Sequence, residues 1–388
     1  MADHIPFLTS EEGKSLVEKY YTDSEVVRVS LHRAEDLLPR ETFSGRIWLD
    51  PSVDGMDELL TRQNSWLDFM TEFPNFRELG DPSRWEKPDA AEVYAFVKAL
   101  LGQCAKFKPA WITVPQIPLS NTSARNKINR VLASATGKWK STTGYSGRLI
   151  LPLVFTHQDQ VNLKTARNAK VLQAERCYHD AQADGFWAVD KSLADDNGSS
   201  TLRNKRFPGL ICLHEELNEH ITSKIRIAGP YWGMNLVLWA RGLVDYPAIG
   251  VGAGYRLFLS GGHAKPPTVK LALPSLRRRV VVAPRLRTWL AAAIKGLSPS
   301  HPCHSEFSDI LNRYTTLSQK DTARRQVAKF YMKWFNSIDA APKAGRSMAL
   351  FQDLSAAYAL GKALPNLEEE GTARRPEAVV EPLMLSCL

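Results

Sequence analysis

The feature that most limits how this 388-residue chain can fold is a repeated alternation of short apolar runs with helix-period segments. It is clearest between Ile225 and Gly262. An apolar run (Ile225–Ala228) ends in Gly229-Pro230, a helix-period segment follows from Met234, and a second apolar run (Pro247–Val251) ends in a glycine-rich stretch. A strand, a turn, a helix and a second strand form the pattern of a βαβ unit in a parallel sheet.

Further strands are predicted near residues 47, 112, 152, 187 and 211, mostly separated by helical segments, with Val269–Leu273 or Val280–Ala283 as an eighth. Seven or eight β/α repeats within roughly 250 residues match the size of a (β/α)8 TIM-like barrel. An open doubly wound sheet is the alternative, because one chain does not reveal strand order. We expect a barrel-like domain in residues 1–284, a helical appendage in 285–365 and a partly disordered tail in 366–388.

Composition limits the class of protein. A hydrophobic content of 44% and a charged content of 23% are typical of a globular chain. The 50 Lys and Arg residues against 41 Asp and Glu give a net charge of +9, which favours a nucleic-acid partner, with protein partner subunits as a further option. The five scattered cysteines, the lack of a signal-peptide pattern and the lack of an apolar run of ~20 residues predict a cytoplasmic protein without membrane contact, metal or cofactor.

Acidic and amide residues recur where predicted strands end. The ends of parallel barrel strands meet at one mouth, so carboxylates distant in sequence can act as a catalytic pair. For each residue alone, the alternative is a helix N-cap. The predicted catalytic residues are Asp245, Asp50 and Asp190. The predicted substrate-binding residues are Gln158, Gln116, Glu216, Gly229, Tyr231, Gly252 and Arg256.

Two basic clusters are candidates for nucleic-acid binding, Arg277-Arg278-Arg279 and the pair Lys138 and Lys140. Arginine can hold phosphate oxygens and a neighbouring aromatic ring can stack on a base, although a charge run is also typical of a solvated face. His214 and His220 are six residues apart, whereas an HExxH zinc motif needs four, so no metal site is predicted.

Several blocks together resemble the queuine and archaeosine tRNA-guanine transglycosylases and their DNA-modifying relatives. In that family a strand ending in a Gly loop precedes an ARG-(hydrophobic)-D segment with the nucleophilic aspartate, and Arg226–Gly229 followed by Trp239–Asp245 is similar. Asp184–Ala188 resembles the family's DGYA strand. Leu151–Gln158 and Ile47–Asp54 lie where its substrate-reading loop and its acid/base loop would be.

The chain departs from that family at four points. The zinc-binding cysteine set is absent, and Asp50 is followed by Pro-Ser-Val instead of Ser-Gly-Gly. Asp245 falls between the two aspartates of the family pattern, and Asp190-Lys191 replaces a glycine pair.

The resemblance implies a glycosyltransferase that modifies DNA or RNA by base exchange at a guanine-type base. Asp245 would attack the sugar carbon, Asp50 would relay protons and Gln158 would read the base edge. Two alternatives remain. One is a non-catalytic barrel that serves as a nucleic-acid-binding or scaffold subunit of a larger complex. The other is an enzyme for a small phosphorylated metabolite bound at the Gly250–Gly254 turn.

Overall fold

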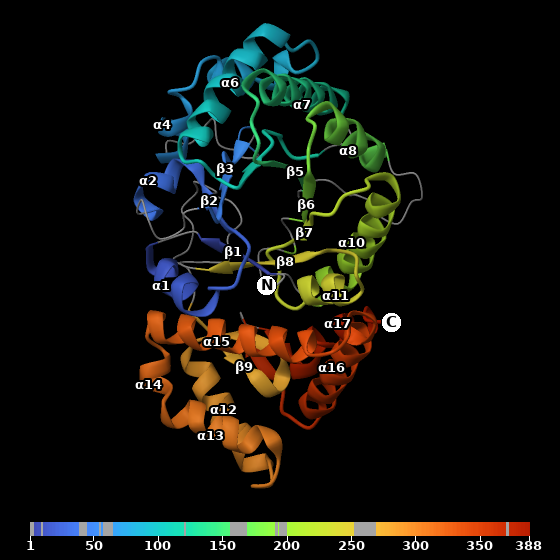
Figure 1. Ribbon diagram of the computed structural model, residues 1–388. Helices are drawn as coiled ribbons and strands as arrows, with labels where there is room; N and C mark the ends of the chain where they lie inside the picture. Colours follow the sequence, from blue (N-terminus) through green and yellow to red (C-terminus); the bar gives the residue numbers. More distant parts are fainter. Residues whose placement is uncertain are drawn as a thin grey trace.

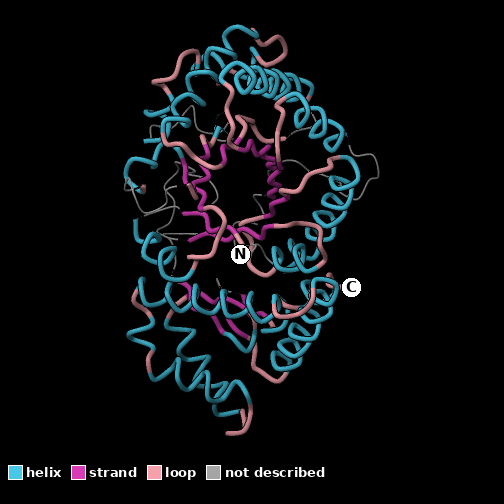
Figure 2. The backbone as a smooth tube through the Cα atoms, in the orientation of Figure 1, coloured by secondary structure: helices cyan, strands magenta, loops and turns pink. Residues whose placement is uncertain are grey.

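The protein is built around a closed barrel of eight parallel strands that follow one another in chain order. The computed structural model describes residues 4–8, 11–38, 45–53, 56, 65–119, 122–155, 169–190, 193, 200–251, 269–369 and 372–388. The strands are β1 (Ile5–Leu8), β2 (Val27–Ser30), β3 (Ile47–Asp50), β4 (Trp111–Thr113), β5 (Arg148–Phe155), β6 (Gly185–Asp190), β7 (Arg226–Ala228) and β8 (Tyr246–Val251). β8 pairs with β1, and Figure 2 shows the closed ring of strands inside a layer of helices. The predicted (β/α)8 TIM-like barrel is confirmed, and the open sheet is excluded.

Helices follow the strands and cover the outside of the barrel (Figure 1). They are α1 (Glu11–Tyr20), α2 (Ala34–Leu37), α4 (Ser65–Met70), α5 (Phe76–Leu79), α6 (Ala90–Lys106), α7 (Ser123–Thr143), α8 (Ala169–Asp180), α10 (Ser200–His220) and α11 (Met234–Ala240). The α6 helix begins where the Asp89 carboxylate accepts the backbone N–H groups of Ala91 and Glu92, at 2.7 and 3.2 Å. Its buried positions, such as Val93, Phe96 and Val97, recur at helical spacing, as the sequence predicted.

Two predicted strands belong elsewhere. The apolar run near residue 211 lies in α10, where Leu210, Leu213 and Leu217 are buried at helical spacing. A short apolar run does not distinguish a buried helix from a strand. The two candidates for the eighth strand instead pair with each other as the antiparallel hairpin of β9 (Lys270–Leu273) and β10 (Arg278–Val281), outside the barrel. The barrel's first strand is β1, which was not predicted from the sequence.

The C-terminal region supplies the eighth helix of the barrel. After the hairpin come α12 (Pro284–Gly296), α13 (Pro302–Asn312) and α14 (Tyr314–Leu317), and then α15 (Lys320–Asp339) returns to cover β8 and β1 (Figure 1). The ring of Phe335 lies 5.1 Å from that of His4, next to β1, and 4.6 Å from that of Trp239 in α11. The predicted boundary at residue 284 therefore does not follow the packing, because α15 belongs to the barrel core.

A second, smaller core lies beyond α15. The hairpin and α12 to α14 form it, with Leu271, Trp289 and Phe307 among its buried residues. The chain then continues through α16 (Arg346–Lys362), β11 (Leu367–Glu369), β12 (Thr372–Arg374), η6 (Pro376–Val379) and α17 (Glu381–Leu385). The tail differs from the partly disordered segment that was predicted, because its described residues are folded and Leu383 is buried. Charged residues near 370 suggested disorder, but the apolar residues that follow anchor the chain.

Among the described residues, no helix combines the length and apolar character needed to cross a membrane.

Candidate functional site at the carboxyl ends of the strands

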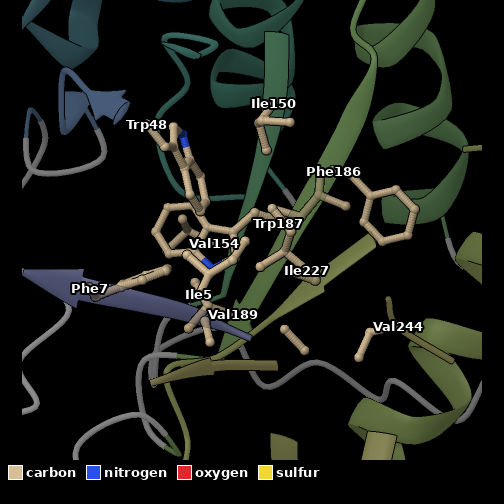
Figure 3. Packing of buried hydrophobic residues seen from close by; sticks show 14 of the residues in the cluster. Ile5, Phe7, Trp48, Ile150, Val154, Phe186, Trp187, Val189, Ile227 and Val244 are labelled. Carbon is tan, nitrogen blue, oxygen red and sulfur yellow. The ribbon is translucent and has the colours of Figure 1, made fainter. Parts of the chain in front are cut away.

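Aromatic rings fill the middle of the barrel (Figure 3). Phe7, Trp48 and Trp187 contact one another edge to face, with ring centroids 5.3 to 5.6 Å apart. They come from β1, β3 and β6, which are not neighbours in the ring of strands, so the contacts must cross the barrel interior. The indole N–H of Trp48 donates a hydrogen bond of 2.9 Å to the hydroxyl of Thr113 on β4. These rings form a packed floor beneath the carboxyl ends of the strands.

A buried ion pair lies directly above this floor. The guanidinium of Arg28 on β2 is 4.6 Å from the ring centroid of Phe7 and 4.8 Å from that of Trp187. It donates to the carboxylate of Asp50, the last residue of β3, and both side chains are 2% exposed. Because Arg28 pairs in register with the inward-facing Trp48, and Ser30 with Asp50, the pair lies inside the barrel.

Two serines lie beside Asp50. The backbone N–H of Ser52 donates to Asp50 Oδ1 at 2.9 Å, and its hydroxyl donates to Oδ2 at 3.3 Å. The hydroxyls of Ser30 and Ser52 are 2.9 Å apart. Ser52 has φ of +57°, a left-handed conformation that is uncommon for a residue other than glycine. The Asp50 carboxylate is therefore fixed by the Arg28 guanidinium and by two donors of Ser52, its backbone N–H and its hydroxyl.

Asp190 lies at the same end of the barrel but in different surroundings. It ends β6, is fully buried, and accepts a hydrogen bond of 2.7 Å from Arg206 Nε on α10. It follows the inward-facing Trp187 by three positions, so alternation directs its side chain toward the helix layer. The backbone N–H of Asp190 donates to the hydroxyl of Tyr231 at 2.6 Å, and burial raises the pKa of that tyrosine well above its ordinary value.

The structure contradicts the predicted position of Asp245. This residue comes immediately before β8, so it lies at the amino end of the barrel, opposite Asp50 and Asp190. Its two carboxylate oxygens accept hydrogen bonds of 2.8 Å from Nε and Nη2 of Arg226, which begins β7. In a β/α repeat, a residue between a helix and the next strand is at the opposite end from a residue that follows a strand. The expectation that Asp245 shares the catalytic mouth is therefore wrong.

The other predicted substrate-binding residues have mixed positions. Glu216 lies within α10 instead of at a strand end, because the strand predicted there is helical. Gln116 follows β4, but its amide donates to the carbonyls of Pro115 and Asn129, both at 2.9 Å, and so fastens the loop to α7. Gly229 follows β7 with φ of +109°, and a Cβ there would lie 2.9 Å from the Ala248 carbonyl oxygen. Gln158, Gly252 and Arg256 lie outside the described residues.

The first predicted nucleic-acid cluster, Arg277-Arg278-Arg279, makes contacts within the protein instead of facing solvent. Arg277 forms an ion pair with Asp353, and buried Arg278 donates to the Pro376 carbonyl at 3.0 Å. The guanidinium of Arg279 lies 4.3 Å from the ring centroid of Trp232 and is also buried. An exposed arginine patch was therefore the wrong interpretation, because these side chains join the hairpin to the barrel and the tail.

The second predicted cluster lies at the amino end of the barrel. Lys140 donates to Asp184 at 2.9 Å, immediately before β6, and Lys138 is exposed, with its ammonium 4.3 Å from the Tyr94 ring centroid. Both lysines belong to α7, not to the predicted basic loop, since the helix continues to Thr143. Because Asp50 lies at the carboxyl end of the barrel, these two lysines cannot lie around it.

Among the described residues, Arg28, Ser30 and Ser52 lie around Asp50 and were not predicted from the sequence as site residues. A signal was present, because Arg28 stands between Val27 and Val29 in an otherwise apolar strand. A charged residue at such a position must be paired once it is buried, which directs the search to a nearby acid.

The fold and this site define the class: a (β/α)8 barrel with a buried carboxylate at the carboxyl ends of its strands. No family model matches the chain, and no curated protein matches its sequence. Within the described ranges, no group of three or more His, Cys, Asp or Glu residues could hold a metal ion.

Proposed function

We propose that the protein is an enzyme that breaks or exchanges the glycosidic bond of a guanine-type nucleoside, in free form or in a nucleic acid, with Asp50 as the acting carboxylate. The position of Asp50 carries the proposal. Its carboxylate lies inside the barrel at the end of β3, fixed by Arg28 and by the backbone N–H of Ser52. Barrel enzymes place their chemistry at this end of the strands.

The chemistry of glycosidic bonds suits a fixed carboxylate. Positive charge develops on the sugar as the bond to the base breaks, and an ionised carboxylate stabilises it or attacks the sugar carbon. The paired Arg28 favours the ionised form of Asp50, and the fixed geometry needs little rearrangement during the reaction. Attack by Asp50 on the sugar carbon forms a glycosyl ester and breaks the bond to the base, which takes up a proton from solvent water. An incoming base or water then attacks the same carbon, releases the Asp50 carboxylate and gives up a proton to solvent.

The nucleoside part of the proposal rests on two further supports. Ile47–Asp54 and Asp184–Ala188, which resemble segments of the guanine transglycosylases, contribute β3 and β6, the two strands that end in acids at this mouth. The net charge of +9 favours a polyanionic substrate. Asp190 ends β6 at the same end of the barrel, but its side chain is directed toward Arg206 in the helix layer, so neither Asp190 nor Asp245 has a part in the proposed site.

The test is a matched pair of substitutions at the two ends of the barrel. Labelled guanine release and incorporation are measured with guanosine, guanosine 5′-monophosphate, tRNA and duplex DNA. Asp50→Asn is expected to lower turnover by about a thousandfold or more, since it removes the acting group. Asp245→Asn makes the same chemical change at the opposite end and is expected to keep the wild-type rate. Wild-type turnover in folded Asp50→Asn would refute the role of Asp50.

A non-catalytic barrel that binds nucleic acid or acts as a scaffold is the second candidate. The observation that favours it is that both acids at the mouth are already paired with arginines and almost completely buried. It predicts no turnover with any of the four substrates and polynucleotide binding that weakens steeply as salt concentration rises. Turnover by the wild-type protein excludes it.

A further inference from the structure

The positive charge of the protein is concentrated in its C-terminal region. Residues 269–388 contain 18 Lys and Arg against 10 Asp and Glu, which accounts for +8 of the net charge of +9. Residues 1–268 are therefore nearly neutral. Part of the C-terminal charge is used within the protein, as in the ion pair of Arg277 with Asp353. The charge that remains at the surface favours a polyanionic partner.

The exposed face of α15 carries a basic stripe formed by Arg325, Lys329 and Lys333. These residues are four positions apart in one helix, so they lie side by side on successive turns. All three are exposed, and none of them forms an ion pair within the part of the chain that the structure describes. Between Asp321 and Asp339 the sequence of α15 contains no acidic residue. The helix therefore does not neutralise the charge of its own basic stripe.

The opposite face of α15 holds the helix in place. Its side chains, such as Val327 and Trp334, are buried in the barrel core. The side-chain amide of Gln326 donates to the carbonyl of Ala272 in β9 and accepts from its N–H, both at 2.8 Å. The basic stripe is thus presented on a fixed helix, and binding needs little ordering of the backbone.

The surroundings of the basic stripe distinguish among polyanionic partners. A helix that lies on a membrane needs exposed apolar residues, and within the described ranges none of the large exposed apolar side chains belongs to α15. A single-stranded nucleic acid is held by stacking of its bases on aromatic rings, whereas the aromatic residues of α15 are buried. A duplex offers only its phosphates, one per ~1.7 Å of axis, and successive turns of a helix lie ~5.4 Å apart. Each cation of the basic stripe can therefore meet one phosphate of a duplex.

We propose that Arg325, Lys329 and Lys333 form a docking surface for the phosphate backbone of double-stranded nucleic acid. Each of the three cations neutralises one phosphate, and binding is independent of sequence because these contacts read no bases. Docking does not rest on the proposed function, because it requires only the charge and geometry of α15.

The test is a charge-removal variant of the full chain, Arg325→Gln/Lys329→Gln/Lys333→Gln. Glutamine keeps a high helix propensity, and thermal unfolding verifies that the variant is folded. Binding to a labelled DNA duplex of about 20 base pairs is measured by fluorescence anisotropy at several salt concentrations. Loss of three phosphate contacts is expected to weaken binding at 0.1 M salt by about a hundredfold. The slope of log affinity against log salt concentration is expected to fall in magnitude by about 2.7.

A matched control removes the same charge from the other side of the barrel. Lys98→Gln/Lys106→Gln/Lys138→Gln changes three exposed lysines of α6 and α7, which lie opposite α15 (Figure 1). Its duplex affinity is expected to stay within about threefold of the wild-type value, since salt screens charges beyond ~10 Å. Equal weakening in the two variants would show that net charge alone attracts the duplex and would overturn the proposal. Wild-type affinity in the α15 variant, or no duplex binding by the wild-type protein, would overturn it as well.

Two further ligands test the assignment to a duplex. The wild-type protein is expected to bind the duplex more tightly than a single strand of the same length or vesicles that contain phosphatidylserine. Tighter binding of the single strand, or binding of the vesicles in preference to the duplex, would overturn the assignment.

The docking surface and the proposed function fail separately. Duplex binding that depends on the basic stripe, without turnover of any substrate, would leave the surface standing and remove the glycosidic activity. Turnover of guanosine that depends on Asp50, without duplex binding, would do the reverse.

Discussion

The two ends of the barrel hold the same kind of ion pair in different surroundings. At the amino end, Arg226 and Asp245 are 19% and 25% exposed, so solvent screens their attraction. At the carboxyl end, Arg28 and Asp50 are both 2% exposed and lie above a floor of aromatic rings. A partly exposed pair fastens neighbouring strands at little cost, whereas a buried pair must overcome a large loss of hydration. The buried pair of Arg28 and Asp50 loses the most hydration and lies at the end where barrels carry their chemistry. This combination is the reason for assigning Asp50 a functional role.

Removal of one member of the buried pair is the strongest way to test this contrast. Arg28→Met leaves the Asp50 carboxylate buried without its counter-charge and is expected to lower the free energy of unfolding by about 3–5 kcal/mol. Urea unfolding measures the change. The double variant Arg28→Met/Asp50→Asn removes both charges and is expected to be more stable than the Arg28→Met single variant. A single-variant loss below about 1 kcal/mol would show that the pair behaves like the one at the amino end.

A smaller effect is expected from His4, a buried neutral group next to β1. Its ring packs against Tyr21 and Phe335, and burial lowers its pKa from 6.5 to about 4. As pH falls from 6.5 to 4, the unfolded histidine gains a proton and the folded one does not, so this group makes the protein progressively less stable across that window. The whole loss is on the order of 3 kcal/mol.

His4→Phe is expected to remove part of this acid sensitivity. Thermal unfolding of both proteins between pH 7 and pH 4.5 provides the measurement, with His179→Phe at an exposed position of α8 as the control. Identical pH profiles for the wild-type protein and His4→Phe would show that His4 does not link the barrel's stability to pH.

The smallest effect is expected at the exposed pair. Asp245→Asn is expected to lower the free energy of unfolding by about 1 kcal/mol or less, and less still at high salt. Urea unfolding at two salt concentrations measures both quantities. A loss as large as that of Arg28→Met would remove the contrast between the two ends of the barrel.

The sequence predicted the fold better than it predicted the site. The unit from β7 to β8 was identifiable because strand, turn and helix signals follow one another locally between Ile225 and Val251. The same local signals failed at Leu210–Leu213, where a short apolar run fits a buried helix as well as a strand. Asp50 and Asp190 were placed at strand ends because each directly follows an apolar run. The prediction for Asp245 was wrong because this residue precedes its strand, whereas Asp50 and Asp190 end theirs. Residues before and after a strand lie at opposite ends of the barrel.

The sequence alone determined that strands and helices alternate, since apolar periodicity is a local property that neighbouring residues fix among themselves. Only the tertiary structure decided which acids share one end of the barrel and which cation each acid meets. Arg28 and Asp50 come together through pairing of β2 with β3, and α15 covers β8 and β1 although more than sixty residues separate it from β8. Such contacts depend on strand direction, register and barrel closure, which no local pattern contains.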